Sequence, residues 1–309
     1  MEKRIINIAK GNNIMKYLTI QEAFERKFKR QKKIKKLKYD ALGSCVHIGK
    51  ISPGCISCFK VDPFAINFFS GTKCNVNCIY CTSNKNDKGG IKTKIIRFAN
   101  RVLKPSKMSA SPPSTFCFGG GGEPLLYFDF ISKRVKLLHR LCKNLKRKPW
   151  LYLYTNGILA NKDMLLKLKE LGFDEIRFHL GATNFSPAVY RHMRIATKYF
   201  KAITVETPAW PPHKKQLFKM LPIIEDIGVK HLNVGEIEVN HNNLKRILKA
   251  FPDAEIYPCY EVHLDDAGLV YDIMEEVIRK NFSYSVLDCN CFVKLIQRGR
   301  AKWICSGDI

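Results

Sequence analysis

Short apolar segments alternate with amphipathic ones through the middle of the chain. Five amphipathic segments predict helices, at 130–145, 161–171, 187–199, 214–227 and 242–251. Gly172 and Gly228 stand where two of these helices would end before a strand. Six other segments are rich in β-branched or aromatic residues, as buried parallel strands are: 64–70, 115–119, 150–154, 175–180, 202–206 and 231–238. Six β–α units in series predict an α/β fold with a parallel, barrel-like sheet.

The segment before these units is strongly basic. Nine Lys or Arg residues lie between Arg26 and Lys38, and apolar residues recur every four positions from Ile20 to Phe28. This spacing predicts a helix over 19–39 whose other faces are cationic. Such a helix can bind RNA phosphates or an anionic membrane surface. A run of charge is also typical of a solvated face, and the sequence leaves these alternatives open.

The pattern divides the chain into three parts. We predict a basic, Cys-containing N-terminal extension at 1–62, a barrel core at 63–251 and an α+β C-terminal extension at 252–309. The last part is expected to hold strands near 255–262 and 284–287 and a helix near 267–280, and to close the open side of the barrel. Barrels of this kind place their chemistry at the carboxyl ends of the strands.

Three cysteines follow the first predicted strand. Cys74, Cys78 and Cys81 lie in the sequence GTKCNVNCIYC, so one tight loop can bring their thiols to a single metal centre. Cubane iron–sulfur clusters and structural zinc sites each take four protein ligands. Three ligands leave one metal position open, which indicates chemistry rather than a purely structural site.

A glycine run ends the second predicted strand. The sequence FGGGGEP places Gly121, Gly122 and Glu123 directly after it. Consecutive glycines let a ligand lie against bare backbone, and a carboxylate just after them can bind an ammonium group. The third strand ends in Thr155-Asn156-Gly157. The carboxyl ends of the first three strands therefore all carry candidate ligand-binding residues.

The cysteine spacing, with Tyr80 as the aromatic residue before the last cysteine, resembles the signature of the radical S-adenosylmethionine (SAM) superfamily. The resemblance covers about 64–251, and the TNG sequence is similar to the branch related to pyruvate formate-lyase activating enzyme. It implies a partial (β/α)6 TIM-type barrel, the radical SAM core. It further implies a [4Fe-4S] cluster on Cys74, Cys78 and Cys81 whose fourth iron binds SAM. The SAM contacts carried over are Tyr80, Gly121, Gly122 and Glu123, with the Gly-Gly-Glu motif at the SAM amino group.

The resemblance implies reductive cleavage of SAM to methionine and a 5′-deoxyadenosyl radical, which abstracts a hydrogen atom from a substrate. Two substrate classes stay open: a protein or peptide, as for the activases, or a tRNA base. Electrons would come from a small acidic donor, ferredoxin or flavodoxin. The alternative outside enzymes is a zinc-dependent RNA-binding module, which would need a fourth close ligand and would not need Glu123.

The fourth strand departs from the pattern of many relatives. It ends in RFHLG (177–181), without the serine that others have near the SAM ribose and carboxylate. Arg177, His179 and Glu206 are the candidates for polar contacts to SAM or substrate in its place. Glu206 at the end of strand five and Glu236 within strand six are expected to face one cavity, or Glu236 and Glu238 to form a solvent-facing pair.

A second group of possible ligands lies outside the predicted barrel. Cys55 and Cys58 form a Cys-x2-Cys sequence after Pro-Gly turn residues. Cys45, His47, Cys289 and Cys291 could complete an auxiliary iron–sulfur or zinc centre; the alternative is a set of reduced thiols in packed segments.

Composition and charge bear on the class of protein, its partners and its compartment, and they do not identify the reaction. The 309 residues are 46% hydrophobic and 26% charged, as in globular proteins, and carry a formal net charge of +26. That charge attracts a polyanion, an acidic redox partner or an anionic membrane without selecting among them. Neither a long apolar run nor a signal-like N-terminus is present, so we expect a cytoplasmic protein with no membrane span. The 12 cysteines then indicate metal ligands and thiols rather than disulfides.

Overall fold

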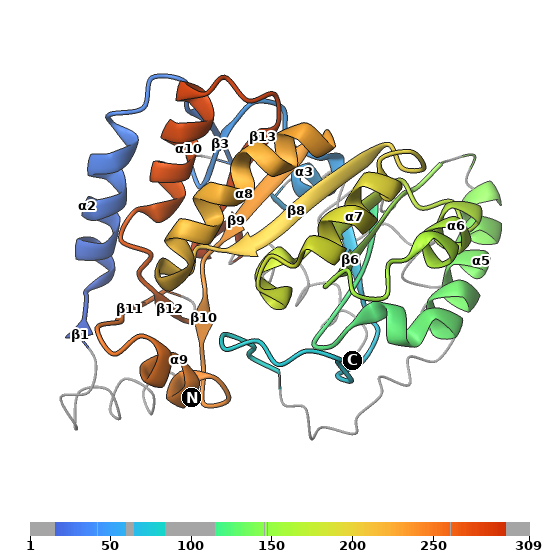
Figure 1. Cartoon of the computed structure of the whole chain (residues 1–309), viewed down its shortest axis with the longest axis horizontal. Helices are drawn as coiled ribbons and strands as arrows, with labels where there is room; N and C mark the ends of the chain where they lie inside the picture. The colour runs from blue at the N-terminus through green and yellow to red at the C-terminus, as the bar shows by residue number, and fades with distance from the viewer. Residues whose placement is uncertain are drawn as a thin grey trace.

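A nine-stranded sheet forms the centre of the molecule (Figure 1). The computed structural model describes residues 16–41, 43–59, 65–83, 115–144, 146, 148–259 and 261–294. The strands, in spatial order, are β2 (Lys38–Asp40), β3 (Cys45–Ile48), β13 (Ser285–Cys289), β9 (His231–Gly235), β8 (Ala202–Pro208), β7 (Glu175–Phe178), β6 (Trp150–Thr155), β5 (Thr115–Gly119) and β4 (Ala65–Phe69). All neighbours from β13 to β4 are parallel, whereas β3 and β2 run antiparallel at one edge.

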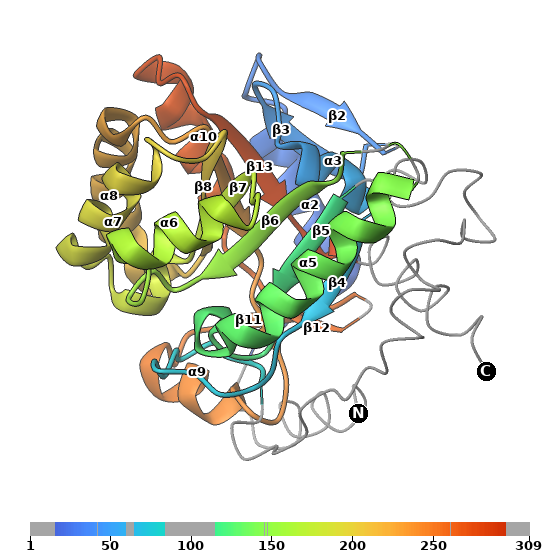
Figure 2. The ribbon, with the colours of Figure 1, turned by 90° about the vertical axis from the view of Figure 1, so that its right-hand side faces the viewer.

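Helices cover one face of this sheet (Figure 2). They are α5 (Phe128–Asn144), α6 (Lys162–Glu170), α7 (Pro187–Ala196), α8 (Lys214–Ile227) and α10 (Leu269–Arg279). Alternate strand residues such as Phe118, Leu153 and Val205 join the main core beneath the helices. The intervening residues face the other side and include Arg177 and Glu206, so this face of the strands is polar. The α/β partial TIM-type barrel is confirmed.

The sheet is wider than the six predicted strands. Val286 of β13 pairs with Leu232 of β9 and with Ile48 of β3, so both ends of the described chain extend the barrel sheet. Strands from 1–62, 63–251 and 252–309 thus share one sheet, and the three-part division stays a prediction. Within the described residues, no helix combines the length and apolar character needed to cross a bilayer.

A second, small sheet lies beside the barrel. It is formed by β1 (Lys16–Tyr17), β11 (Glu255–Pro258), β12 (Val262–Leu264) and β10 (Glu238–Val239). The predicted strand 231–238 is therefore two strands in different sheets, and the predicted strand 255–262 is the first arm of a β11–β12 hairpin. Glu236 lies between β9 and β10, where the chain changes sheet. The short helix α9 (Leu244–Ala250) follows β10.

Two predictions for the N-terminal segment were wrong. The helix predicted over 19–39 ends early: α2 spans Ile20–Gln31, begins with a Thr19–Glu22 capping box, and is followed by a turn that buries Ile34 in the main core. The Cys-x2-Cys turn is instead part of a helix, α3 (Pro53–Phe59). Proline is favoured at the first helical position, so Pro53 starts a helix rather than a metal-binding turn.

The basic helix α2 directs several of its cations into the protein. Lys27 is 4% exposed and forms an ion pair with Glu236. Arg26 bonds Asp265 at 2.9 Å and also pairs with Glu255, and Arg30 pairs with Asp272 of α10. Figure 1 shows α2 standing beside α10. The charges on this face of α2 are therefore paired with carboxylates of the protein, fully buried at Lys27 and partly exposed at Arg26 and Arg30.

The buried carboxyl group of Asp266 makes stability depend on pH. Burial raises its pKa from about 3.8 to about 6, while Lys27 acts in the opposite direction. The native state thus binds this proton more tightly than the unfolded chain does. The resulting stabilisation is complete below about pH 4 and is lost as pH rises through about 6. At 1.36 kcal/mol per pKa unit, the loss is about 3 kcal/mol.

We expect Asp266→Asn to remove most of this slope, measured by urea unfolding at a series of pH values from 4 to 7. An unchanged slope in the variant would assign the pH dependence to other groups.

Candidate functional site

A pocket of about 300 Å³ lies at the carboxyl ends of β4, β5, β6 and β7. Its size is at the lower end of the range for small-molecule sites. All seven residues predicted as metal or SAM contacts line it. The lining consists of Cys74, Val76, Cys78, Tyr80, Cys81, Thr82, Ser83, Gly120, Gly121, Gly122, Glu123, Pro124, Tyr154, Thr155, Asn156, His179 and Ala182. The structure therefore brings together the three motifs that the sequence places on separate strand ends.

The Glu123 carboxylate connects two of these strand ends. It accepts hydrogen bonds from Thr155 Oγ1 at 2.7 Å, from the Asn156 backbone N–H at 2.7 Å and from the Leu125 N–H at 3.1 Å. Burial raises the pKa of Glu123, and these three hydrogen bonds act against that rise. A carboxylate can accept about four hydrogen bonds, so one acceptor position remains for a ligand. The Thr-Asn-Gly sequence thus orients the carboxylate.

The cysteine loop packs directly on the glycine run. The backbone N–H of Glu123 donates to the Lys73 carbonyl oxygen at 2.9 Å. A Cβ atom at Gly122 would lie 2.2 Å from that same oxygen, which is backbone and cannot move aside alone. Only glycine allows this approach, so Gly122 fixes the distance between the two motifs.

Gly122→Ala is therefore expected to displace the cysteine loop from the pocket. We expect the iron content after anaerobic reconstitution to fall at least several-fold. Gly228→Ala is a matched control, because Gly228 has open space around it and its left-handed backbone conformation (φ 84°) makes it strained without touching the site. Equal iron content in the two variants would contradict the proposed role of the close contact.

Tyr80 forms one wall of the pocket. Its ring stacks on His179 with centroids 5.7 Å apart and meets Trp210 edge-on. Burial lowers the pKa of His179 to about 4, so this imidazole is neutral at neutral pH. The Tyr80 hydroxyl is buried and has no hydrogen-bond partner among the described residues. Buried hydroxyls normally bond to protein or to ordered water, so this one keeps a hydrogen-bonding group available to a ligand in the pocket.

Three asparagines hold the cysteine loop from its other side. Asn243 donates to the Tyr80 carbonyl oxygen at 3.0 Å, and Asn240 and Asn242 donate to that of Thr82 at 3.1 and 2.9 Å. They precede and begin α9, which lies beside the loop in both views (Figures 1 and 2). The sequence prediction missed these residues. The sequence NHNN (240–243) was the signal that could have indicated them, because three amide side chains close together can bond the backbone of a neighbouring loop.

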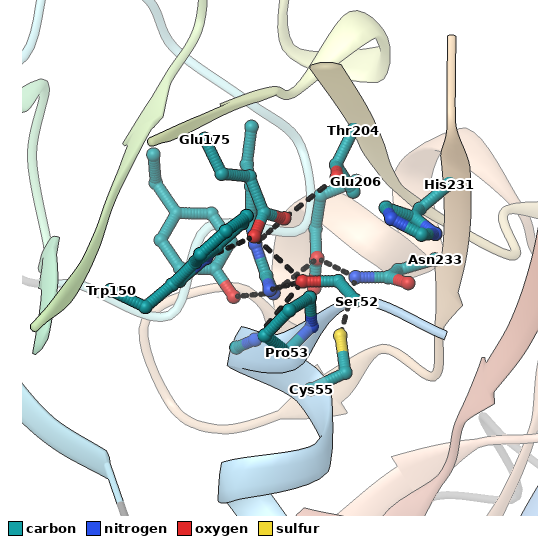
Figure 3. A network of polar contacts seen from close by, with 12 residues as sticks. Ser52, Pro53, Cys55, Trp150, Glu175, Thr204, Glu206, His231 and Asn233 are labelled. Atoms are coloured by element: carbon teal, nitrogen blue, oxygen red, sulfur yellow. Dashed lines mark hydrogen bonds and ion pairs between the residues drawn. The ribbon is translucent and has the colours of Figure 1, made fainter. Parts of the chain in front are cut away.

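The polar face of the barrel contains a separate network (Figure 3). Arg177 is 1% exposed and donates to Glu175 at 2.8 Å, to Tyr154 at 2.9 Å and to Ser52 of the N-terminal segment at 3.1 Å. Glu206 lies 3.7 Å from the same guanidinium. Among the three polar candidates of the sequence prediction, only His179 lines the pocket. Arg177 is a buried cation whose hydrogen bonds go to Glu175, Tyr154 and Ser52.

Glu206 and Glu236 belong to different environments. Glu206 accepts a hydrogen bond from Asn233 at 2.8 Å in the barrel network, and burial raises its pKa. Glu236 is 4% exposed, pairs with Lys27 and accepts from the Cys291 N–H at 2.7 Å. The expectations of one shared cavity and of a solvent-facing Glu236–Glu238 pair were both wrong, because the chain changes sheet after Gly235.

Two of the candidate auxiliary ligands, Cys55 and Cys291, lie in different parts of the described structure. Cys55 is buried and accepts a hydrogen bond from Asn233, and burial raises its pKa to about 12. Cys291 packs in a different cluster with Cys259, so it does not join Cys55 and Cys58. Within the described ranges, no three His, Cys, Asp or Glu side chains converge on a single metal ion. Cys291 is therefore not part of one centre with Cys55 and Cys58, and an auxiliary centre on the remaining candidates stays a prediction.

The loop cysteines suit a cluster better than a single ion. In a cubane cluster each cysteine binds a different iron, so the three sulfurs need to surround one pocket rather than to meet at one point. Cys74, Cys78 and Cys81 are each partly exposed and all line the pocket. Their placement is compatible with a [4Fe-4S] group.

Comparison with known proteins decides the family. The model of the Radical SAM superfamily matches residues 69–249. The chain belongs to this superfamily. A candidate glycyl-radical enzyme activating enzyme of Methanocaldococcus jannaschii is 28% identical over 212 residues, which cover 65% of this chain and 54% of that protein. An uncharacterised protein of the same organism is 29% identical over 42% of this chain and 43% of its own length.

The chain thus spans about half the length of the curated relatives that it matches. Among solved structures, Streptococcus suis SuiB bound to S-adenosylmethionine has a TM-score of 0.52 at 12% identity, over 75% of this chain and 51% of that one. That likeness supports the fold. This radical SAM protein is an enzyme by its family, and the family implies an iron–sulfur cluster and SAM. Neither RNA-related alternative from the sequence is favoured.

Proposed function

We propose that this radical SAM enzyme holds a [4Fe-4S] cluster on Cys74, Cys78 and Cys81 and cleaves SAM reductively in the pocket beside it. When bound, the cluster supplies the electron that breaks the SAM sulfonium bond. The observation that carries the proposal is the single pocket lined by all three cysteines, the glycine run and Glu123. Glu123 has an open acceptor position for the SAM amino group, and Tyr80, Gly121 and Gly122 supply the surrounding wall.

We further propose a protein or peptide as the substrate. The support is the similarity to a candidate glycyl-radical enzyme activating enzyme, a class of protein that acts on another protein. The tRNA alternative rested on the basic helix. It has less support because three cations of α2, Arg26, Lys27 and Arg30, form ion pairs within the protein. A small acidic donor, ferredoxin or flavodoxin, remains the proposed electron source and suits the net charge of +26.

The direct test is anaerobic reconstitution of the whole chain, followed by visible absorption, iron analysis and measurement of 5′-deoxyadenosine after chemical reduction with SAM. A brown protein that forms 5′-deoxyadenosine is expected. A colourless protein that binds zinc and leaves SAM intact would overturn the assignment.

The role of Glu123 can be tested separately. A charge-assisted hydrogen bond contributes about 1.5–3 kcal/mol, so Glu123→Gln should weaken SAM binding by about 10- to 150-fold. Iron content should stay near that of the unmodified protein, because Glu123 is not a predicted cluster ligand and the amide oxygen can still accept from Thr155 Oγ1 and the Leu125 N–H on one side. Equilibrium titration of the reconstituted protein with SAM measures the change. Unaltered SAM affinity would remove Glu123 from the binding site.

A further inference from the structure

One arginine outside the barrel binds the backbone of the cysteine loop at two of its cysteines. Arg246 of α9 donates from Nη1 to the Cys78 carbonyl oxygen at 2.7 Å and from Nη2 to the Cys81 carbonyl oxygen at 2.7 Å. Nη1 also reaches Asn77 Oδ1 at 3.2 Å, and Nη2 reaches the Asn242 carbonyl oxygen at 3.1 Å. The planar fork of the guanidinium makes this two-point contact possible, and an ammonium group could not reproduce it.

The charge of Arg246 has no anionic partner in the described part of the chain. All of its hydrogen bonds there go to neutral carbonyl or amide oxygens, and its side chain is only partly exposed. A partly buried cation is costly unless a negative group lies nearby. The three cysteines whose loop it holds would supply such a group as the thiolate ligands of a cluster. A [4Fe-4S]²⁺ core on three thiolates carries a net charge of −1, which becomes −2 on reduction.

We propose that Arg246 is a positioning residue with two effects, which rest on the proposed cluster. Its fork fixes the backbone of the cysteine loop, and its charge favours the reduced cluster over the oxidised one. Charge and hydrogen bonding near an iron–sulfur cluster set its reduction potential. The chain thereby places a dedicated cation beside the site where an electron must enter.

The two effects are separated by two substitutions. Arg246→Gln removes the charge and the fork, whereas Arg246→Lys keeps the charge and loses the fork. Lys249→Gln removes an exposed cation on the same helix and serves as the control. Each reconstituted protein is titrated with a redox mediator set and followed by electron paramagnetic resonance. Hydrogen exchange of residues 74–83 is measured on each metal-free protein.

For Arg246→Gln we expect the ratio of reduced to oxidised cluster at a fixed solution potential to fall about tenfold. For a one-electron couple this is a shift of about 59 mV to more negative potential. Arg246→Lys and Lys249→Gln should shift it far less. Exchange in the cysteine loop should quicken in both Arg246 variants and stay unchanged in Lys249→Gln.

Equal potentials in Arg246→Gln and Lys249→Gln would overturn the electrostatic effect, and unchanged exchange would overturn the positioning effect. If the unmodified protein forms no cluster, the proposed function fails, while the exchange measurement on metal-free protein still decides whether Arg246 holds the loop. If Arg246→Gln alone loses its cluster, the reduction potential is measured on Arg246→Lys instead. A potential close to that of Lys249→Gln supports the charge effect, because both proteins keep a cation at position 246. A potential about 59 mV more negative contradicts it.

Discussion

Cys78→Ala is expected to abolish formation of 5′-deoxyadenosine from SAM. Iron in a cluster is bound by soft thiolate ligands, which a methyl group cannot replace. The same loss is expected for Cys74→Ala and Cys81→Ala, since the three residues line one pocket. The measurement is 5′-deoxyadenosine per protein after anaerobic reduction with SAM, compared with iron bound per protein. We expect the product to fall below one per cent of the unmodified level.

Two other cysteines provide matched controls. Cys117 on β5 and Cys142 on α5 are buried thiols that do not line the pocket. Alanine at either position removes a buried sulfur of similar size and should leave SAM cleavage intact. Product formation by any of the three loop variants, or its loss in both controls, would contradict the assignment of the cluster ligands.

Lys27→Met is expected to destabilise the protein strongly. The substitution leaves the buried Glu236 carboxylate without its cation, and breaking a buried ion pair from one side costs about 3–5 kcal/mol. Lys27 and Glu236 have side-chain exposures of 5% and 1%, so water cannot replace the lost partner. Urea unfolding followed by circular dichroism measures the free energy of unfolding.

The control for this change lies two residues away. Lys29 is exposed on the same helix, so Lys29→Met should alter the free energy of unfolding by less than about 0.5 kcal/mol. A double variant, Lys27→Met with Glu236→Gln, should recover part of the loss because no buried charge remains. Equal effects of the two single changes would show that the pair is not the source of the stability.

The position of Lys27 also changes how RNA binding should be tested. Deleting residues 1–40 would remove the whole basic segment and is the simplest test of its contribution to tRNA binding. That deletion also removes the partner of Glu236 and the edge strand β2. A tRNA titration at two salt concentrations should instead compare the intact chain with neutral substitutions at the exposed Lys29, Lys32 and Lys33.

Local signals in the sequence predicted most of the barrel. The predicted bounds of the strand Thr115–Gly119 and of the helix Lys214–Ile227 match the observed ones, because buried parallel strands and amphipathic helices have strong sequence patterns. The cysteine loop and the glycine run were predicted to meet because both follow strand ends, and one pocket contains them. The individual roles of these residues stay predictions.

The features that the sequence prediction missed depend on contacts between distant segments. The bonds from Arg246 to two carbonyl oxygens have no periodicity or motif, since the acceptors are backbone atoms that every residue possesses. The burial of Lys27 could not be predicted from the sequence either, because Lys27 is one of nine basic residues in this segment and nothing local distinguishes it from the exposed ones. β2 and β3 are short, and their place at the sheet edge depends on pairing with β13.

The pairing of β3 with β13 has a consequence for how the protein is made. Ile48 lies opposite Val286, so a strand synthesised early finds its partner only when nearly all of the described chain exists. Such distant pairing raises the contact order and slows folding. The edge of β3 stays open meanwhile, and unpaired strand edges favour aggregation. Productive expression should therefore improve at low temperature or with chaperones that shield the nascent chain.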